Sequence, residues 1–181
     1  MRTTVALTSV AAALTVGGLA AAGPASAATG SQVVAFTVAA GTLAITPGAP
    51  AVGVNASLTG GTTTASIDLG LTTVADTRIS STGWAVSAAT TDFTVTPGTG
   101  SISRANAAFS VPAAPLNVLG SATFTTQAAP TAVDASGSVG NLVVATATGI
   151  TTATFSPRLA VTVPNGSATG IYTATITQTV V

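Results

Sequence analysis

The sequence predicts an all-β protein: a single β-sandwich of the Ig-like or Greek-key type that follows an N-terminal signal peptide. Three observations favour the β class. β-branched residues alternate with small ones at a period of two, no segment carries a helical stripe of apolar residues, and Gly and Pro interrupt the apolar runs at short intervals. Short strands spaced in this way are typical of sandwiches and barrels. No internal repeat of fixed period is visible, and nothing marks a second domain.

The first 27 residues have the pattern of a secretory signal peptide. Arg2 supplies a basic start, residues 5–22 are apolar and small, and Ala25-Ser26-Ala27 forms a small-x-small cleavage site. A transmembrane anchor is the alternative, but Thr, Ser and Gly interrupt the stretch and no basic stop signal follows it. We therefore predict a signal peptide at 1–27, a mature domain at 28–181, and no membrane span after signal removal.

Apolar alternation predicts the strands of the mature chain. In chain order they are expected at residues 33–38, 42–46, 52–58, 67–71, 84–88, 93–95, 122–126, 159–163 and 172–180. Ile67, Leu69 and Leu71 are expected on one face of their strand. Residues 128–149 are small, polar and rich in Gly, so they are predicted to hold the longest loop. Pro164-Asn165-Gly166 predicts a turn that ends the strand before it.

Charged residues are unusually scarce in this chain. It has four Arg, four Asp and no His, and charged residues make up 4% of it, against about 25% in ordinary domains. With a net charge of zero, the chain cannot be steered to nucleic acid or anionic lipid by its electric field, and no nucleic-acid partner is expected. Solubility must come from hydroxyl groups, and Thr occupies 36 positions. Such a surface protects weakly against association, so self-association is kept as an alternative.

The residue inventory predicts a protein that is not an enzyme. The chain has no His, Cys, Lys or Glu that could titrate near neutral pH, and a Ser nucleophile would have no base. Two facing Asp residues could serve a glycosidase-type mechanism, but each Asp also has a plain role as a turn or cap residue. No Asp-x-Asp run suggests calcium. We predict no catalytic residue, no metal and no cofactor. The Asp candidates are Asp68, Asp76, Asp92 and Asp134.

One constellation in the sequence resembles a known family. Its pieces are Asp76-Thr77-Arg78, Gly83-Trp84-Ala85-Val86, Asp92-Phe93, Phe155-Ser156-Pro157, Leu159 to Pro164, and Gly170-Ile171-Tyr172. Together they resemble the WxL domain, a cell-surface module of Gram-positive bacteria that associates noncovalently with peptidoglycan. The resemblance runs loosely from about Phe36 to Val181. It implies a partner that is peptidoglycan or another cell-wall polymer, and other surface proteins are kept as an alternative partner.

The resemblance also points to particular residues. The family's first Trp-x-Leu corresponds to Trp84-Ala85-Val86, and the second corresponds to Gln178-Thr179-Val180, so one signature Trp is kept and the other is replaced. The candidate binding or signature residues that follow from the resemblance are Trp84, Val86, Asp76, Arg78, Tyr172 and Gln178.

The same positions also allow a structural interpretation. Trp84 alternates with Val86 on an inward face, and a lone Trp in a sandwich is usually a core residue. Asp76 and Arg78 lie on the same side of an extended chain, so they could pair with each other as an exposed pair or tie down a loop. Tyr172 follows Gly170 in the manner of a tyrosine corner, in which the phenol anchors a crossover.

Two functions of different classes are therefore expected. The first is a secreted, extracellular domain that is associated noncovalently with the cell wall. The second is a structural subunit of a surface fibre, coat or biofilm matrix. Low charge, high Thr content and a strand-rich pattern favour the second function, because exposed sheet edges invite strand addition.

Overall fold

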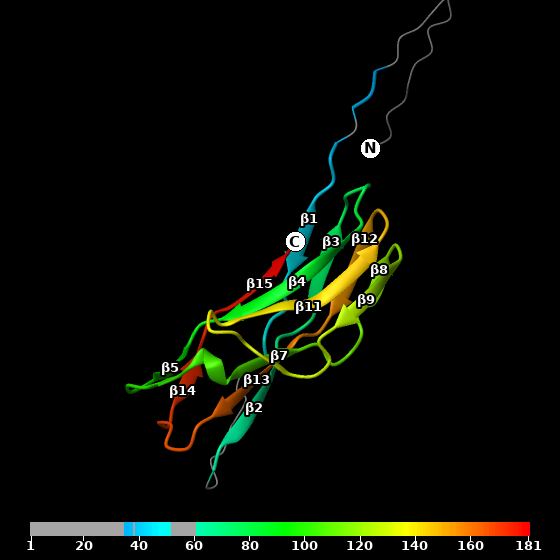
Figure 1. Ribbon diagram of the computed structural model, residues 1–181. Coiled ribbons are helices and arrows are strands. Elements are labelled where there is room, and N and C mark those ends of the chain that lie inside the picture. The colour runs from blue at the N-terminus through cyan, green and yellow to red at the C-terminus, as the bar shows by residue number, and fades with distance from the viewer. Residues whose placement is uncertain (1–34, 38, 52–60) are drawn as a thin grey trace, which may run out of the picture. The chain divides into compact units, whose positions relative to one another are not determined.

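The computed structural model describes residues 35–37, 39–51 and 61–181, and it confirms the all-β prediction (Figure 1). Val38–Val181 forms one compact unit. The predicted signal peptide and the strand expected at 52–58 lie outside the described residues. Of the strand expected at 33–38, residues 35–37 are described and belong to no strand, and Phe36 is 84% exposed.

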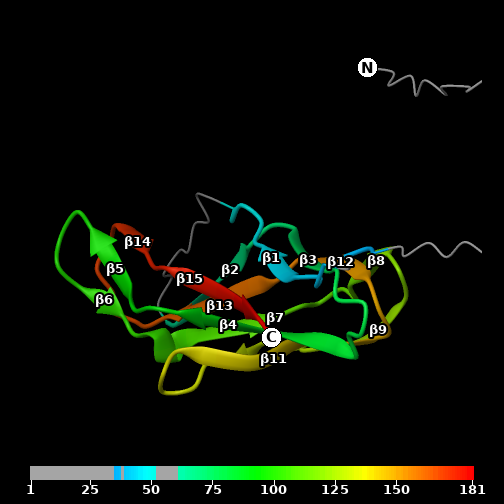
Figure 2. The same cartoon turned by 90° about the horizontal axis from the view of Figure 1, so that it is seen from above.

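Four antiparallel sheets build the sandwich, and Figure 2 shows them in two layers. Sheet A consists of β1 (Leu43–Thr46), β3 (Thr72–Asp76), β12 (Thr151–Phe155) and β8 (Leu116–Leu119). Sheet B consists of β10 (Thr131–Ala132), β7 (Ala107–Ser110), β13 (Arg158–Val163) and β2 (Thr63–Asp68). Sheet C consists of β15 (Ile176–Val180), β4 (Gly83–Thr90), β11 (Ser138–Ala147) and β9 (Ala122–Thr126). Sheet D consists of β14 (Ile171–Thr173), β5 (Phe93–Thr96) and β6 (Ser101–Ile102).

Each layer is one long sheet that is interrupted in the middle. β2 leads into β3, β12 into β13 and β7 into β8, so three chain segments pass between sheets A and B. At this junction the N–H of Leu69 donates to the carbonyl of Pro157 (3.0 Å). β4 leads into β5 and β14 into β15, which joins sheets C and D in the same way. At the second junction the N–H of Thr91 donates to the carbonyl of Thr175 (3.1 Å).

The core lies between the layers and follows the expected alternation of side chains. In β4, every second residue from Trp84 to Thr90 is buried, and the residues between them are partly exposed. Val74 of β3 and Ala153 of β12 are fully buried in the opposite layer and belong to the same apolar cluster. The sequence pattern and the observed burial therefore agree along these segments, because every second side chain of a strand points to the same face of the sheet.

The prediction of a long loop at 128–149 is wrong. This segment contains β10 and β11, and β11 is a strand of ten residues that pairs with β4 on one side and β9 on the other. Its small residues suit this central place in sheet C. Ala145 lies between Trp84 and Phe124 in the register, and the two rings meet over it with their centroids 5.9 Å apart. A larger residue at this position would keep the rings apart.

Two predicted strands differ from the structure at the junctions. Leu71 is 59% exposed instead of facing the core, because Gly70 takes a φ of +78° and breaks the alternation. The expected last strand at 172–180 is divided into β14 and β15, which pair with β5 and β4. Its alternation survives the break, since every second residue from Tyr172 to Val180 is half-buried.

The turn predicted at Pro164-Asn165-Gly166 is confirmed, and Gly166 takes a φ of +83° there. The one helix among the described residues is the 3-10 turn η1 (Arg104–Asn106). No helix within those residues has the length and hydrophobicity needed to cross a membrane.

Candidate functional site

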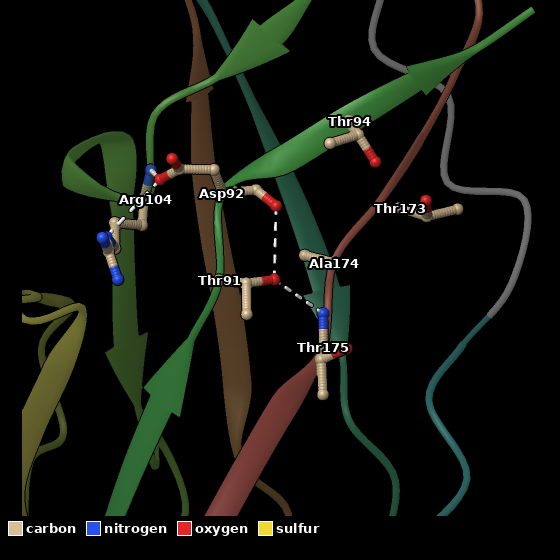
Figure 3. A pocket seen from close by; sticks show the side chains of 7 residues that line it. All are labelled: Thr91, Asp92, Thr94, Arg104, Thr173, Ala174 and Thr175. Carbon is tan, nitrogen blue, oxygen red and sulfur yellow. Dashed lines mark hydrogen bonds and ion pairs between the residues drawn. The ribbon is translucent and has the colours of Figure 1, made fainter.

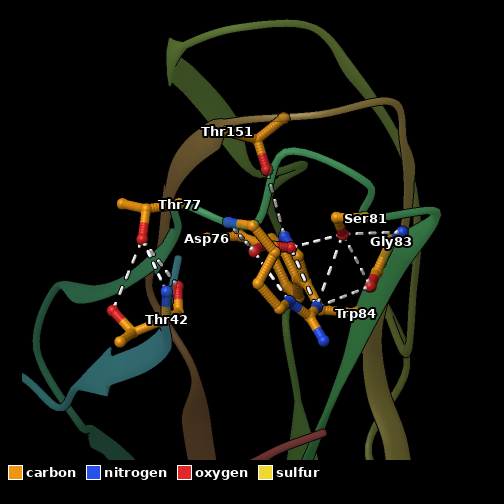
Figure 4. A network of polar contacts seen from close by, with 8 residues as sticks. Thr42, Asp76, Thr77, Ser81, Gly83, Trp84 and Thr151 are labelled. Atoms are coloured by element: carbon orange, nitrogen blue, oxygen red, sulfur yellow. Dashed lines mark hydrogen bonds and ion pairs between the residues drawn. The ribbon is translucent and has the colours of Figure 1, made fainter. Parts of the chain in front are cut away.

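Asp76, which Figure 4 labels, forms an ion pair with Arg78 at the end of β3, and this confirms that the two residues pair with each other. The carboxylate accepts from Nε (2.8 Å) and Nη2 (2.9 Å) of Arg78 and from the hydroxyl of Ser81 (2.5 Å). The Asp76 side chain is fully buried, whereas the Arg78 side chain is 37% exposed, so only the cation of the pair reaches the surface. The hydrogen bonds from the Arg78 guanidinium lower the pKa of Asp76 from 3.8 to about 2.

This pair also ties down the loop that precedes β4. Nη2 of Arg78 donates to the carbonyl of Gly83 (3.1 Å), and the N–H of Gly83 donates to the Ser81 hydroxyl (3.1 Å). Gly83 takes a φ of +134°, and a Cβ there would overlap the carbonyl oxygen of Ala145. The loop therefore packs against β11 at Ala145, and these contacts fix the position of Gly83, the first residue of β4.

Trp84 and Val86 are core residues, as the structural interpretation predicts. Trp84 is 4% exposed, and its indole N–H donates to the hydroxyl of Thr151 in the opposite layer (3.4 Å). Val86 is fully buried. Both side chains are therefore buried from a polymer outside the domain, and Trp84 supports the fold.

Tyr172 anchors the turn before β14, which confirms the expected tyrosine corner. Its hydroxyl donates to the carbonyl oxygen of Ala168, four residues upstream, at 2.9 Å. Gly170 takes a φ of +153° and lies against Val95, where a Cβ would be too close to the Val95 side chain. The phenol group is therefore used within the fold.

Gln178 links the two layers at the edge formed by β1 and β15. Its Oε1 accepts a hydrogen bond from the hydroxyl of Thr72 (3.2 Å), and Thr72 is fully buried in β3 of the opposite layer. A Trp at this position would enter the space between the layers. All six residues selected by the resemblance thus have structural roles.

Two other Asp residues have the turn roles that the sequence allows. Asp68 accepts from the N–H of Gly70 (2.8 Å). Asp134 accepts from the N–H groups of Ser136 and Ser138 (2.9 Å each), and the hydrogen bond from the Ser136 side chain is the main cause of its lowered pKa. Within the described residues, no group of three or more His, Cys, Asp or Glu side chains could hold a metal ion.

A polar depression lies at the junction of sheets C and D, where β4 passes into β5 and β14 into β15 (Figure 3). It is shallow, with a volume of about 520 Å³. The N–H of Thr175 donates to the Thr91 hydroxyl (3.0 Å), which fixes the two chain segments against each other. The lining residues are Thr91, Asp92, Thr94, Arg104, Thr173, Ala174 and Thr175.

Asp92 and Arg104 form the rim of this depression. Their side chains are 50% and 41% exposed, and Oδ1 of Asp92 lies 3.5 Å from Nε of Arg104. The N–H of Arg104 donates to the same Oδ1 (2.9 Å), and Nη1 donates to the carbonyl of Ser136 (3.2 Å). Backbone contacts therefore hold both side chains in place. Within the described residues, Oδ2 of Asp92 and Nη2 of Arg104 make no hydrogen bond.

Thr94 and Thr173 add hydroxyl groups to the same surface. They face each other across the β5–β14 pair, and both are exposed. Each hydroxyl can donate one hydrogen bond and accept two. The depression therefore offers donors and acceptors to a polar ligand.

Sequence reasoning missed this site, apart from Asp92. Its residues come from two segments about seventy to eighty positions apart, which the pairing of β5 with β14 brings together. In a chain so rich in Thr, the Thr residues of the site do not stand out in the sequence. Comparison with protein-family models, curated proteins and solved structures found no match to this chain. The resemblance to the WxL domain remains a prediction from the residues quoted above.

Proposed function

We propose that this chain is a secreted, non-enzymatic domain that attaches noncovalently to a cell-wall polysaccharide. Peptidoglycan is the polymer that the resemblance to the WxL domain implies. The observation that carries the proposal is the depression at the junction of sheets C and D, where exposed Thr hydroxyls surround a carboxylate and a guanidinium with unused hydrogen-bonding atoms.

The chemistry of this depression fits a polymer of sugars better than a charged ligand. Asp92 and Arg104 have opposite charges, so the site has no net charge with which to attract an ion. Sugar hydroxyls can donate to the Asp92 carboxylate, and ring or acetamide oxygens can accept from the Arg104 guanidinium. Thr94 and Thr173 can form hydrogen bonds of either kind.

Binding at one such site is expected to be weak. A net contribution of about 1 kcal/mol for each hydrogen bond is typical, and an open depression buries little apolar surface. A repeating polymer compensates for this weakness, because neighbouring repeats raise the effective concentration of the ligand beside each domain. Weak, repeated contact suits a domain that is retained on a wall without a covalent bond.

Co-sedimentation of the mature protein with purified sacculi tests the proposal. The pelleted fraction should change little between roughly 50 mM and 500 mM salt, since screening acts on charges and the site has no net charge. Arg104→Gln should lower the pelleted fraction, whereas Arg158→Gln, at an exposed Arg in β13, should not. Failure to pellet at any salt would overturn wall binding. Pelleting that high salt abolishes would show an electrostatic attachment that this depression does not explain.

A structural subunit of a surface fibre, coat or biofilm matrix is the second candidate function. The observation that favours it is an exposed apolar strand at the edge of sheet A, on β8. This edge is separate from the depression. The two-fold contact argued below would join two copies through it, so a fibre would need a further contact elsewhere on the chain.

A further inference from the structure

β8 is an edge strand whose side chains are exposed. It pairs with β12 on one side, and no other described strand pairs with its free side. All four of its residues are exposed, and Leu116, Val118 and Leu119 are 70%, 65% and 57% exposed. Ile150, which is 45% exposed, belongs to the neighbouring turn, because its carbonyl oxygen lies against Gly120 at the end of β8. We call these four apolar residues the β8 patch.

The β8 patch has only part of the usual protection of a sheet edge. Edge strands in monomeric proteins are commonly protected by short length, bulges, charged side chains, Pro or a cover. β8 is short, with four residues, but it has neither a charged residue nor Pro, and no charged residue occurs between Arg104 and Asp134. A register shift against β12 between Asn117 and Leu119 limits the regular edge to a few residues. Side-chain burial must therefore supply much of the energy of any contact there.

We propose that this edge binds β8 of a second copy of the chain, antiparallel, about a two-fold axis between Asn117 and Val118. In that arrangement Leu116 of each copy faces Leu119 of the other, so one strand supplies both halves of a self-complementary contact. Free backbone N–H and C=O groups of the two edges pair beside the register shift, and sheet A continues from one copy into the other.

Charge favours a second copy over a charged partner. The β8 patch carries no charge and the chain has a net charge of zero, so two copies approach without repulsion. A partner with a charged surface would have to bury its charges against apolar side chains, which is costly. A second copy instead brings an identical apolar strand with the same unpaired backbone groups.

The proposed contact leaves the polar depression accessible. In both views, β8 lies at the opposite end of the sandwich from β5 and β14, which border the depression (Figures 1 and 2). A dimer joined through β8 would therefore carry two depressions. If the depression binds a polymer, pairing would raise the avidity of attachment without any new contact to the polymer.

Sedimentation velocity over a range of protein concentrations tests the inference without any ligand. The wild-type mature protein should show a dimer whose population rises with concentration. Leu119→Lys should weaken dimerisation by on the order of tenfold or more, since each Lys would lie against an apolar residue of the other copy. Leu71→Lys is the matched control, because Leu71 is 59% exposed and Leu119 is 57% exposed, and because Leu71 directly precedes β3, which β12 separates from β8.

A mixing experiment tests the pairing itself. Leu116→Asp and Leu119→Lys should each be monomeric, and an equimolar mixture should dimerise, because the new carboxylate and ammonium groups would face each other. Unchanged fluorescence of Trp84 would show that the variants fold. A wild-type monomer at all concentrations, equal effects of Leu119→Lys and Leu71→Lys, no rescue on mixing, or open-ended filaments would each overturn the two-fold β8 contact.

Discussion

Asp76 and Arg78 stand two residues apart, Asp92 and Arg104 stand twelve apart, and each couple forms an ion pair. The first pair is bidentate at 2.8 and 2.9 Å, with a fully buried carboxylate. The second has a single charged contact at 3.5 Å, and both side chains are exposed. Both residues of the first pair belong to the motifs that resemble a known family, whereas only Asp92 of the second pair does, and Arg104 lies outside those motifs.

The difference shows how burial decides the role of the same two residue types. Both carboxylate oxygens of Asp76 are occupied by Arg78 and Ser81, so this pair can only support the loop before β4. Asp92 and Arg104 are positioned by backbone groups and keep unused atoms on the surface. Mutations at the Asp76–Arg78 pair should therefore change the stability of the domain. Mutations at the Asp92–Arg104 pair should change ligand binding.

The largest effect is expected for Trp84→Ala, beside the first pair. Loss of the buried indole and of its contact with Phe124 should lower the free energy of unfolding by about 3–5 kcal/mol. Chemical denaturation measures this, with Phe36→Ala as a control, because Phe36 is 84% exposed and should change stability very little. In the wild type, blue-shifted Trp fluorescence that acrylamide quenches poorly is expected. Freely quenched fluorescence would contradict a core position.

The next largest effect is expected when the two carboxylates, Asp76 and Asp92, are each replaced by Ala. Asp76→Ala should lower the free energy of unfolding by about 2–4 kcal/mol, because it leaves Arg78 and Ser81 without their acceptor. Asp92→Ala should cost less than about 1 kcal/mol, since exposed pairs contribute little. Equal losses in urea denaturation would mean that the two regions do not differ as described.

Acid should separate the two regions further. Because the pKa of Asp76 falls from 3.8 to about 2 on folding, the pair contributes its full stability above about pH 4 and loses it as the pH falls toward 2. Denaturation midpoints at pH 7, 4, 3 and 2 should therefore fall less steeply for Asp76→Ala than for the wild type. Asp134 also has a lowered pKa and remains in this variant, so part of the acid sensitivity should persist. If the midpoints of the wild type and Asp76→Ala fell equally with pH, the Asp76–Arg78 pair would not be a source of the acid sensitivity.

Local alternation was enough to predict several strands, among them β1, β4, β5, β9 and β13, because apolar and small residues alternate within each of them. It failed for β11. There, small residues such as Ala145 fill a central strand between two aromatic rings and resemble a loop when read alone. Leu71 was misplaced because alternation ends at Gly70, whose φ of +78° the sequence pattern did not reveal.

The candidate sites divide in the same way. The pairing of Asp76 with Arg78 could be predicted, because residues two apart in an extended segment share a side. The hydrogen bond from Tyr172 back to Ala168 followed from a known local arrangement. The depression could not be predicted, because Thr94 meets Thr173 only through the register of β5 and β14. Long-range pairing of this kind leaves no local trace in a single sequence.

Removal of two hydroxyls from the depression tests the central claim most directly. Thr94→Val/Thr173→Val keeps β-branched side chains on β5 and β14 while deleting both hydroxyls. Thr64→Val/Thr162→Val is the matched control, because these residues form another exposed cross-strand pair, on β2 and β13. With sacculi at a fixed salt concentration, the first double variant should bind on the order of thirtyfold more weakly, since two lost hydrogen bonds at about 1 kcal/mol each amount to about 2 kcal/mol, and the control should match the wild type. Equal binding by all three proteins would contradict the assignment of polymer binding to this depression.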